Sequence, residues 1–399
     1  MNRLYDIIVV GAGPGGSALA ARLARAGLDV LLLDKQIFPR DKTCGDALTP
    51  EAVRILHRLG LAESLSQSAF RIDDICVTTP CGVQVKAPFS ADGTPGCVIP
   101  RIKLDELLRG EAVAAGAEFV GDVRVSQVIE EEEKKVIGAS RGSAPSWRGR
   151  VIVLAVGASV GLLKALKLLP RRPEFDYAAR LYFDGISGLG NRIDVRLDGV
   201  PLPGYGWIFP LSHSSANVGV GLFGRSSHNS YEVLGRFLKH PPIAQLIGAG
   251  QPQGPPKSYP LRTDFHRSPL RRGRLLLIGE AAGLVNPFTG EGIDYALESA
   301  EYAAECLLDS FARGDFSEQA LSQYDRRLRA RFQRVFVFTS WMRRIYMTSP
   351  LLDALGRACA RWPELTGLFA EILLTREDPR KAFGPKVVLR ILRSLPAQA

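Results

Sequence analysis

The segment from residue 6 to residue 34 constrains the fold of this chain more than any other stretch, because it combines two apolar runs with a glycine turn and a helix. The β-branched run Ile7–Val10 predicts a buried strand, and Val30–Leu33 predicts a second one. Between them, Ser17–Ala26 is rich in alanine and leucine and predicts a helix that ends at a glycine. This order predicts a Rossmann-type strand-helix-strand unit.

The turn after the first strand reads Gly11-Ala12-Gly13-Pro14-Gly15-Gly16 and matches the pattern G-x-G-x-x-G. Gly11 permits a tight turn, Gly13 lets the backbone approach a pyrophosphate, and Gly16 lets the helix pack closely on the strand. The amino terminus of the helix offers free N–H groups to the anion. Asp34 ends the second strand, where an acid binds an adenosine ribose hydroxyl. These features predict an ADP-containing dinucleotide and leave FAD and NAD open.

A second glycine turn lies late in the chain, at Gly279–Gly283, after the apolar run Arg274–Ile278. The run predicts a buried strand, and Tyr295–Ala300 predicts a helix. FAD is longer than ADP, and its flavin half needs contacts from another part of the chain. We expect the late turn to bring a second helix amino terminus to the pyrophosphate and the ribityl chain, which favours FAD.

The bulk composition narrows the class of protein. A chain of 399 residues with 46% hydrophobic content can bury a large core. The longest uncharged apolar stretch, residues 151–163, is too short to span a bilayer as a helix, and the amino terminus has no secretory signal pattern. Six cysteines without a C-x-x-C spacing favour a reduced setting. We therefore expect a cytoplasmic protein without a metal site.

The formal net charge of +10 is concentrated late in the chain, where residues 321–347 contain seven arginines and one acid, Asp325. A helix that mixes arginine with aromatic residues fits either an anionic membrane surface or an ordinary solvated face, and both interpretations stay open. No nucleic-acid-binding motif accompanies the charge, so we do not expect a nucleic-acid partner.

Four sequence blocks, taken in order, resemble one family of flavoproteins. They are the amino-terminal glycine turn, "FPRDKTCGDALTP" at 38–50, "GYGWIFP" at 204–210 followed by "NVGVG" at 217–221, and "NPFTGEGI" at 286–293. Together they resemble the geranylgeranyl reductases, which share the fold of the FAD-dependent aromatic hydroxylases. The resemblance runs from about residue 5 to about residue 300 of the chain.

The resemblance implies roles for individual residues. The "CGD" block would lie beside the isoalloxazine, so Cys44, Asp46 and Tyr205 become the candidate catalytic residues, with Cys44 as acid or flavin-tuning group. Tyr205, Trp207 and Phe209 would line the substrate cavity in front of the flavin. The candidate cofactor-binding residues are Gly11, Gly13, Gly15, Gly16, Asp34, Lys35, Arg40, Cys44, Gly45, Arg101, Gly279, Glu280, Gly283, Pro287, Gly290, Gly292 and Ile293.

Two positions depart from the family pattern. Glu280 stands where an aspartate is usual, so its carboxylate reaches one methylene farther. Val156 stands where related flavoproteins have the acid of an A-D-G segment, which removes an expected contact to the flavin side of FAD. The same region, residues 157–161, matches the G-x-S-x-G nucleophile elbow of hydrolases, with Asp264 and His266 as conceivable partners. A hydrolase fold does not account for the other blocks.

We expect an α/β fold with a Rossmann-type FAD-binding domain, an inserted antiparallel β-sheet substrate domain and a helical C-terminal region. The discontinuous FAD-binding domain comprises 1–68, 98–165 and 269–310. The antiparallel substrate domain comprises 69–97 and 166–268, where short β-like runs are broken by Gly and Pro. The helical region comprises 311–399. A charged hairpin is expected at 128–138.

The resemblance implies an FAD-dependent oxidoreductase that hydrogenates C=C bonds of an isoprenoid chain on a lipid, a quinone or a related small hydrophobic molecule. NAD(P)H or a ferredoxin would supply the electrons, because no second nicotinamide-binding turn is present. The main alternative is an FAD-dependent monooxygenase of the same fold, acting on an aromatic or polyketide-like substrate. A flavoprotein that binds lipid without turnover is a third interpretation, and peripheral membrane association is compatible with the first.

Overall fold

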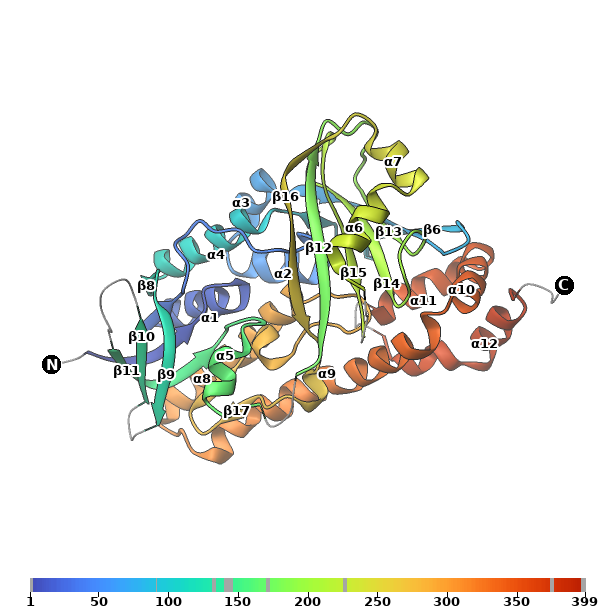
Figure 1. The fold of residues 1–399 in the computed structure, drawn as a ribbon. Helices are drawn as coiled ribbons and strands as arrows, with labels where there is room; N and C mark the ends of the chain where they lie inside the picture. Colours follow the sequence, from blue (N-terminus) through green and yellow to red (C-terminus); the bar gives the residue numbers. More distant parts are fainter. Residues whose placement is uncertain are drawn as a thin grey trace.

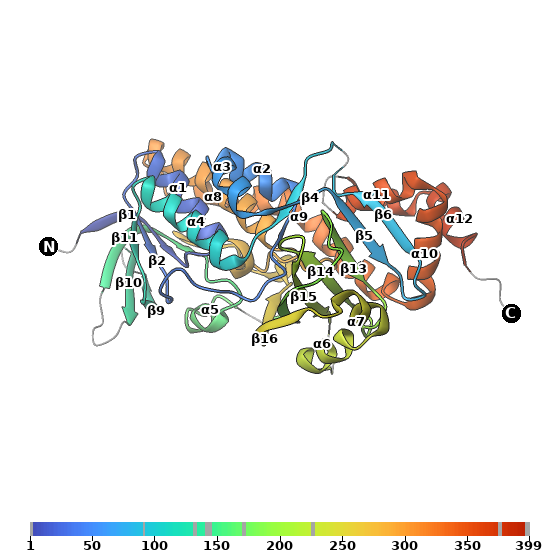
Figure 2. The ribbon, with the colours of Figure 1, turned by 90° about the horizontal axis from the view of Figure 1, so that it is seen from above.

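The computed structural model describes residues 3–90, 92–130, 134–139, 146–169, 173–224, 228–373 and 377–395. Figures 1 and 2 show an elongated molecule with the amino terminus at one end and the carboxyl terminus at the other. A Rossmann-type layer lies at the amino-terminal end, a large sheet lies in the middle, and a group of helices lies at the far end.

The first sheet is built on the strands that the sequence predicts. Its main order is β17 (Arg271–Arg272), β18 (Leu275–Leu277), β11 (Ser146–Leu154), β1 (Leu4–Val10), β2 (Val30–Leu33) and β8 (Glu118–Val120). β1 pairs in parallel with both β11 and β2, and the aliphatic side chains in the middle of the sheet, at 7–10, 30–33 and 151–154, are buried. Continuous aliphatic runs suit central parallel strands, which are covered on both faces.

Three helices cover one face of this sheet, α1 (Pro14–Arg25), α4 (Arg101–Ala114) and α8 (Ile293–Arg313), and α1 packs between the other two (Figure 2). The expected hairpin is present, because β9 (Arg124–Glu130) pairs antiparallel with β10 (Lys134–Ala139) and β10 pairs with β11. The tip of that hairpin, with its run of glutamates at 131–133, lies outside the described residues.

The second sheet has the order β16 (Gln251–Arg262), β12 (Phe175–Asp184), β15 (Ser215–Leu222), β14 (Gly204–Pro210), β13 (Arg192–Arg196), β5 (Asp74–Thr78) and β6 (Gln84–Pro88). Its neighbouring strands are antiparallel with one exception, since β5 and β13 pair in parallel. Strands joined by a short hairpin must be antiparallel, but more than a hundred residues, including α4 and β11, separate β5 from β13, so this pair is free of that constraint. α6 (Ser230–Leu238) and α7 (Pro241–Ile247) cover the outer face.

A small third sheet connects the two larger ones. It has the order β3 (Ala47–Leu48), β7 (Gly96–Val98) and β4 (Phe70–Ile72), and α2 (Pro50–Arg58) and α3 (Ala62–Ser68) lie next to it in sequence. The segment 69–97 is thus divided, because its ends belong to this small sheet and its middle belongs to the second sheet. α5 (Val160–Ala165) follows β11.

The carboxyl-terminal part is helical, as expected. α9 (Glu318–Tyr346) runs along the molecule, and α10 (Ser349–Arg361), α11 (Pro363–Leu373) and α12 (Pro385–Leu392) gather beside β5 and β6 (Figures 1 and 2). Short 3-10 turns occur at Phe265–Arg267, Gly279–Ala282 and Pro379–Phe383. α8 ends at Arg313, so the expected boundary between residues 310 and 311 falls inside this helix, and the turn at Gly314 separates α8 from α9. Within the described residues, no helix is long and apolar enough to cross a membrane.

Candidate functional site

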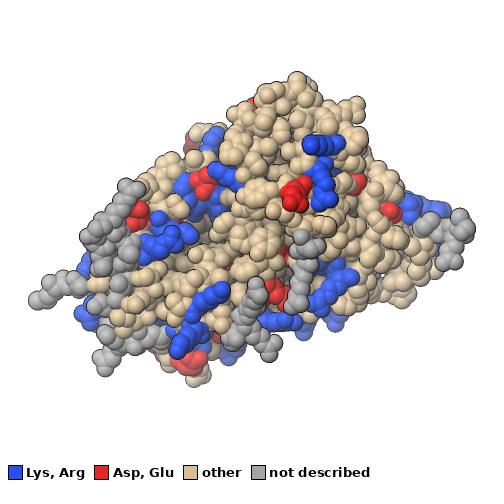
Figure 3. Space-filling model, in the orientation of Figure 1, with Lys and Arg blue, Asp and Glu red and all other residues tan. Residues whose placement is uncertain are grey.

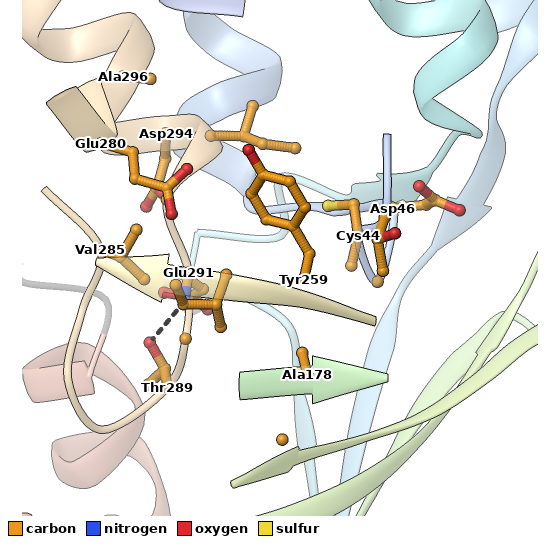
Figure 4. Close-up of a pocket in the computed structure, with 18 of the residues that line it drawn as sticks. Cys44, Asp46, Ala178, Tyr259, Glu280, Val285, Thr289, Glu291, Asp294 and Ala296 are labelled. Carbon is orange, nitrogen blue, oxygen red and sulfur yellow. Dashed lines mark hydrogen bonds between the residues drawn. The ribbon is translucent and has the colours of Figure 1, made fainter. Parts of the chain in front are cut away.

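One large cavity of about 890 Å³ lies where the Rossmann part, the second sheet and the carboxyl-terminal helices meet. This volume is at the upper end of the range for small-molecule sites. Figure 4 shows a part of it, with Cys44 and Asp46 on one side, Glu280, Asp294 and Glu291 on the other, and the Tyr259 ring between them. The cavity therefore collects residues from blocks that are far apart in the sequence.

The first glycine turn has the geometry that a dinucleotide site requires. Gly11 has φ +110°, and a Cβ placed on it would lie 2.3 Å from the carbonyl oxygen of Ala155. A Cβ on Gly16 would lie 1.9 Å from the Gly11 carbonyl oxygen, so this glycine is needed for the helix to pack on the turn. A Cβ on Gly13 would meet only the Arg40 guanidinium, at 3.8 Å. The space beside Gly13 is thus open to the cavity, as the close approach of a pyrophosphate to the backbone requires.

The helix after this turn is prepared to receive an anion. α1 begins at Pro14, earlier than the sequence pattern predicts, and no side chain caps its amino terminus. The first N–H groups of a helix have no partner within the helix, so uncapped ones are available to a pyrophosphate. These observations fit the ADP half of FAD.

Asp34 supports the same turn. One of its carboxylate oxygens accepts a hydrogen bond from the Ala12 N–H at 2.8 Å, and the other accepts one from the Gln36 N–H at 2.8 Å. Each carboxylate oxygen can accept a second bond, so contact with a ribose hydroxyl stays a prediction. The neighbouring Lys35 lines the cavity, and burial, assisted by Arg124, lowers the pKa of its ammonium group.

The late glycine turn differs from the expectation in one respect. Gly279–Ala282 forms a short 3-10 turn, and Gly283, at φ +76°, ends it. The long helix α8 begins only at Ile293, after a second loop that is closed by a hydrogen bond from the Asn286 N–H to the Glu291 carbonyl at 2.8 Å. The predicted helix amino terminus is therefore supplied by this second loop and not by the 279–283 turn. Both loops line the cavity.

Glu280 occupies the region where the family acid is missing. Its carboxylate accepts a hydrogen bond from the Arg262 N–H and pairs with the Lys42 ammonium group, both at 3.1 Å. A Cβ on Gly157 would lie 3.4 Å from the carboxylate. The longer side chain of Glu280 thus brings a negative charge to the backbone beside Val156, which itself lines the cavity.

Two of the predicted cofactor residues do not line the cavity. Gly283 packs behind the turn, where a Cβ would lie 2.8 Å from both Asp264 Oδ1 and the Phe265 nitrogen. Pro287 is buried, and its carbonyl accepts a hydrogen bond from Arg343 at 3.2 Å. The other predicted cofactor and substrate residues all border the cavity.

Asp46 is the centre of a buried hydrogen-bond network. Its Oδ2 accepts a bond from the Tyr182 hydroxyl at 2.6 Å and one from the Asn217 amide at 2.8 Å, while the Arg101 N–H donates to Oδ1 at 3.3 Å. Asn217 also donates to the Cys44 carbonyl at 2.8 Å. Burial raises the pKa of Asp46 to about 6, although the hydrogen bonds from Tyr182 and Asn217 act in the opposite direction. The network fixes the "CGD" loop, so the geometry favours a positioning role for Asp46.

A second buried network holds two arginines that the sequence assigns to the cofactor. Asp105 is fully buried, and its carboxylate bonds the Arg101 guanidinium at 2.7 and 2.8 Å and pairs with Arg40 at 2.6 Å. Burial raises the pKa of the Cys44 thiol, although the nearby Arg101 guanidinium acts in the opposite direction. The thiol is therefore neutral in this environment.

Strand β14 presents its predicted aromatic side chains to the cavity. The Tyr205 hydroxyl donates to the Thr289 carbonyl at 2.5 Å, and the Trp207 indole N–H donates to Asn217 Oδ1 at 3.0 Å. Phe209 packs on Gly45, where a Cβ would lie 2.9 Å from its ring. Residues in the intervening positions face α6 and α7, as the alternation of a strand requires.

Beyond these aromatic residues the cavity continues as an apolar arm. It passes between the inner strands of the second sheet and the helices α10 and α11, which pack against β6. The side chains that line it are mainly aliphatic or aromatic and include Ile75, Val77, Leu197, Leu352, Leu355 and Phe369. The sequence contains no local signal for this arm, because it arises from the packing of distant elements.

The hydrolase alternative receives no support from the described residues. Asp264 forms an ion pair with Arg262 at 2.8 Å and accepts a bond from Ser268, and His266 does not border the cavity that Ser159 lines. All six cysteines are free thiols. Among the residues that the structure describes, no group of three or more His, Cys, Asp or Glu side chains is placed to hold a metal ion.

Comparison with known proteins agrees with this geometry. The family model of the FAD binding domain matches residues 4–146 and 257–339. A menaquinone reductase of Mycobacterium tuberculosis (strain ATCC 25618 / H37Rv) is 35% identical over 320 residues, which is 76% of this chain and 76% of that protein. A digeranylgeranylglycerophospholipid reductase of Methanocella arvoryzae is 30% identical over 349 residues, covering 82% of this chain and 84% of that protein.

Solved structures share the whole fold. A geranylgeranyl bacteriochlorophyll reductase-like protein from Thermoplasma acidophilum superposes with a TM-score of 0.79 at 23% identity, covering 99% of this chain and 97% of that chain. The flavin-dependent brominase Bmp2 superposes with a TM-score of 0.79 at 20% identity, covering 98% of each chain. At these identities the likeness describes the fold alone.

Proposed function

The chain belongs to the FAD binding domain family and, within it, to the geranylgeranyl reductase-like flavoproteins, and it is an FAD-dependent oxidoreductase; on this premise we propose that it hydrogenates C=C bonds in the isoprenoid chain of a quinone or lipid. The observation that carries the proposal is the apolar arm of the cavity. It extends from Tyr205 and Trp207 to α10 and α11 and offers an extended apolar ligand continuous contact with aliphatic and aromatic side chains. An isoprenoid chain has that chemistry.

The chain's own residues divide the cavity into two parts with different tasks. The polar part, with Gly13, the amino terminus of α1 and Asp34, would hold the pyrophosphate and adenosine of FAD. Cys44, Tyr205 and Trp207 border the point where the polar part meets the apolar arm. When bound and reduced, FAD supplies a hydride to the substrate, with electrons that NAD(P)H or a ferredoxin would first deliver. The aromatic side chains position the double bond and exclude water.

The head group that we propose is a quinone. Relatives named menaquinone reductase align over about three quarters of the chain at 33–35% identity, whereas those named digeranylgeranylglycerophospholipid reductase align at 28–30%. A menaquinone is therefore the first substrate to test, and a geranylgeranyl lipid is the second.

Peripheral association with a membrane is part of the proposal, but the arginine-rich part of α9 does not carry it. Three of its arginines are engaged within the protein, Arg327 with Glu305, Arg331 with Glu298, and the buried Arg343 with Asp176. On the face drawn in Figure 3, basic side chains form separate groups with acidic ones among them.

The apolar side chains at the carboxyl-terminal end fit a membrane better. Val337, Trp341 and Ile345 are exposed at helical spacing on α9, and Leu389 and Leu392 are exposed on α12. Arg344, Lys386 and Arg393 are exposed beside them in the sequence. Apolar side chains flanked by basic ones suit the surface of an anionic bilayer, from which an isoprenoid substrate would enter.

The experiment that tests the proposal blocks the apolar arm. Ala370 lines the arm on α11, and Ala370→Trp would fill it, whereas Gly367 on the same helix is exposed and has open space around it. We expect Ala370→Trp to lower the hydrogenation rate for a long-chain menaquinone at least tenfold with unchanged FAD content, and Gly367→Trp to leave it unchanged. Equal rates in Ala370→Trp and the wild type would contradict the proposed substrate path.

The alternative, a monooxygenase of the same fold, predicts a different dependence on oxygen. The flavin-dependent brominase superposes on this chain as well as the reductase-like protein does, so the fold does not separate the two functions. A product that forms only in air and contains a new oxygen atom would favour the alternative.

A further inference from the structure

One titratable side chain of the cavity has no part in the assignments above. Glu291 lies between Gly290 and Gly292 in the loop before α8, and it borders the cavity (Figure 4). Its Oε2 atom is buried and has no hydrogen-bond partner in the structure. Its backbone N–H donates to the Thr289 hydroxyl at 3.4 Å, and the carbonyl of Thr289 receives the Tyr205 hydroxyl. The Glu291 carboxylate also interacts electrostatically with the Tyr205 phenol, and both residues border the cavity, so the carboxyl group lies near Tyr205.

The other candidate proton donors of the cavity are less suited to the task. Tyr205 directs its hydroxyl proton to the Thr289 carbonyl, and burial, followed by the nearby Glu291, raises the pKa of its phenol well above the ordinary value. Asp46 is fully buried within the "CGD" loop and accepts hydrogen bonds on both oxygens, which hold its carboxylate in place. Burial raises the pKa of Cys44, which makes its thiol a poor acid near neutral pH.

The charges around Glu291 favour its protonated form. Burial, reinforced by the carboxylate of Asp294 in the first turn of α8, raises the pKa of Glu291. The pKa of Asp294 is also raised, by burial and by Glu298, while Arg331 acts in the opposite direction. Tyr295 and Tyr205 are the other titratable groups that interact with Glu291, and both are neutral near neutral pH. Two buried carboxyl groups in one site do not ionise together, so one of them retains its proton near neutral pH.

We propose that Glu291 is the general acid of this site and protonates the alkene. The inference rests on the proposed function. The O–H bond of Glu291 breaks, its proton forms a C–H bond at one alkene carbon, and the π bond supplies that electron pair. The other carbon receives the hydride that the reduced cofactor supplies, so that two C–H bonds replace one π bond. Glu291 is left as a carboxylate and regains a proton from water at the cavity mouth.

The substitution Glu291→Gln in the full-length, FAD-loaded protein tests this step. Glutamine has the same size and keeps an acceptor oxygen but cannot donate a proton in this way. A general acid contributes typically about 100-fold to 10,000-fold in rate. We therefore expect the pre-reduced enzyme to form the menaquinone with a hydrogenated side chain, measured by product mass without oxygen, at least 100-fold more slowly, with unchanged FAD content and unchanged reduction by dithionite. Glu305→Gln, on α8 outside the cavity and paired with Arg327, is the matched control.

Glu291→Asp serves as a second variant, because it keeps the acid with a shorter reach. An intermediate rate is expected for it even if the glutamine variant binds FAD poorly. A glutamine variant as fast as the wild type would overturn the inference while leaving the proposed function in place. A wild-type enzyme that hydrogenates no isoprenoid substrate would instead overturn the proposed function.

A second readout does not depend on activity. In the infrared spectrum at neutral pH, the wild-type protein should show the C=O stretch of a protonated carboxyl group that shifts in D₂O and disappears as the pH rises. The band should be absent from Glu291→Gln and present in Glu305→Gln. An unchanged band in Glu291→Gln, or no such band in the wild type, would contradict a protonated Glu291 whatever the substrate.

Discussion

Removal of the Asp105 carboxylate should destabilise this protein far more than removal of an exposed acid from the same helix. Asp105 is fully buried, and the Arg101 side chain that it bonds twice is only 4% exposed. Burial alone would lower the pKa of Arg101, but the Asp105 carboxylate raises it, so the guanidinium stays charged. In Asp105→Ala this charge, together with that of Arg40, would remain in the interior without its partner.

The expected cost can be bounded from this geometry. Breaking a buried ion pair by removing one partner costs about 3–5 kcal/mol. Folded proteins are stable by about 5–15 kcal/mol, so the variant would lose a large part of its stability. Because Arg40 and Arg101 both border the cavity, its FAD affinity should fall as well.

Glu106→Ala is the matched control on α4. Glu106 pairs with Arg109 at 2.5 Å, but the two side chains are 36% and 21% exposed, and such a pair contributes about 0–1 kcal/mol. Guanidinium-induced unfolding of the apoproteins, followed by circular dichroism, gives both free energies of unfolding. If Asp105→Ala loses no more stability than Glu106→Ala, the buried cluster does not hold this part of the fold and the reasoning is wrong.

Three further predictions concern the cavity wall. Gly13→Ala should fold normally yet bind FAD at least tenfold more weakly, as measured by fluorescence titration. Gly16→Ala should also lower the unfolding midpoint, because its Cβ would lie 1.9 Å from a backbone oxygen. Equal unfolding midpoints for the two variants would contradict this reasoning. Burial raises the pKa of Asp46 from 3.8 to about 6, so the folded state binds the Asp46 proton more tightly, and the contribution of Asp46 to stability falls as the pH rises from about 4 to about 6. Asp46→Asn should therefore flatten the dependence of the thermal unfolding midpoint on pH in this range. An unchanged dependence on pH would refute this prediction. Glu280→Asp withdraws the carboxylate from Gly157 and should weaken FAD binding about tenfold, which corresponds to the loss of one charge-assisted hydrogen bond. An unchanged dissociation constant for FAD would contradict the idea that Glu280 takes the place of the acid that is missing at Val156.

The sequence predicted the parts of the site that are encoded locally. The turn was recognisable because Gly11 and Gly16 meet steric requirements of one strand-turn-helix unit, while Gly13 leaves the space beside it open. The alternating aromatic residues of β14 were recognisable as one face of a strand, and that face borders the cavity. The fold class is confirmed by the family model and by the structural match.

The parts that were missed depend on contacts between distant segments. Tyr182 and Asn217 reach Asp46 only because β12 and β15 pair beside the "CGD" loop. The amino terminus of α8 replaces the helix start expected after Gly283, because a second loop intervenes. Glu291 lies in the block at 286–293, but only its burial next to Asp294 distinguishes it from a solvated acid. A sequence pattern does not report burial of this kind.

Isoprenoid hydrogenation is tested most directly by incubating the FAD-loaded protein, reduced by dithionite without oxygen, with a menaquinone and with a geranylgeranyl lipid, and measuring the product masses. The account predicts that at least one substrate gains pairs of hydrogen atoms in its isoprenoid chain. It also predicts that the flavin spectrum returns to the oxidised form as the product appears. Substrates of unchanged mass beside a flavin that reoxidises only when air is admitted would contradict it.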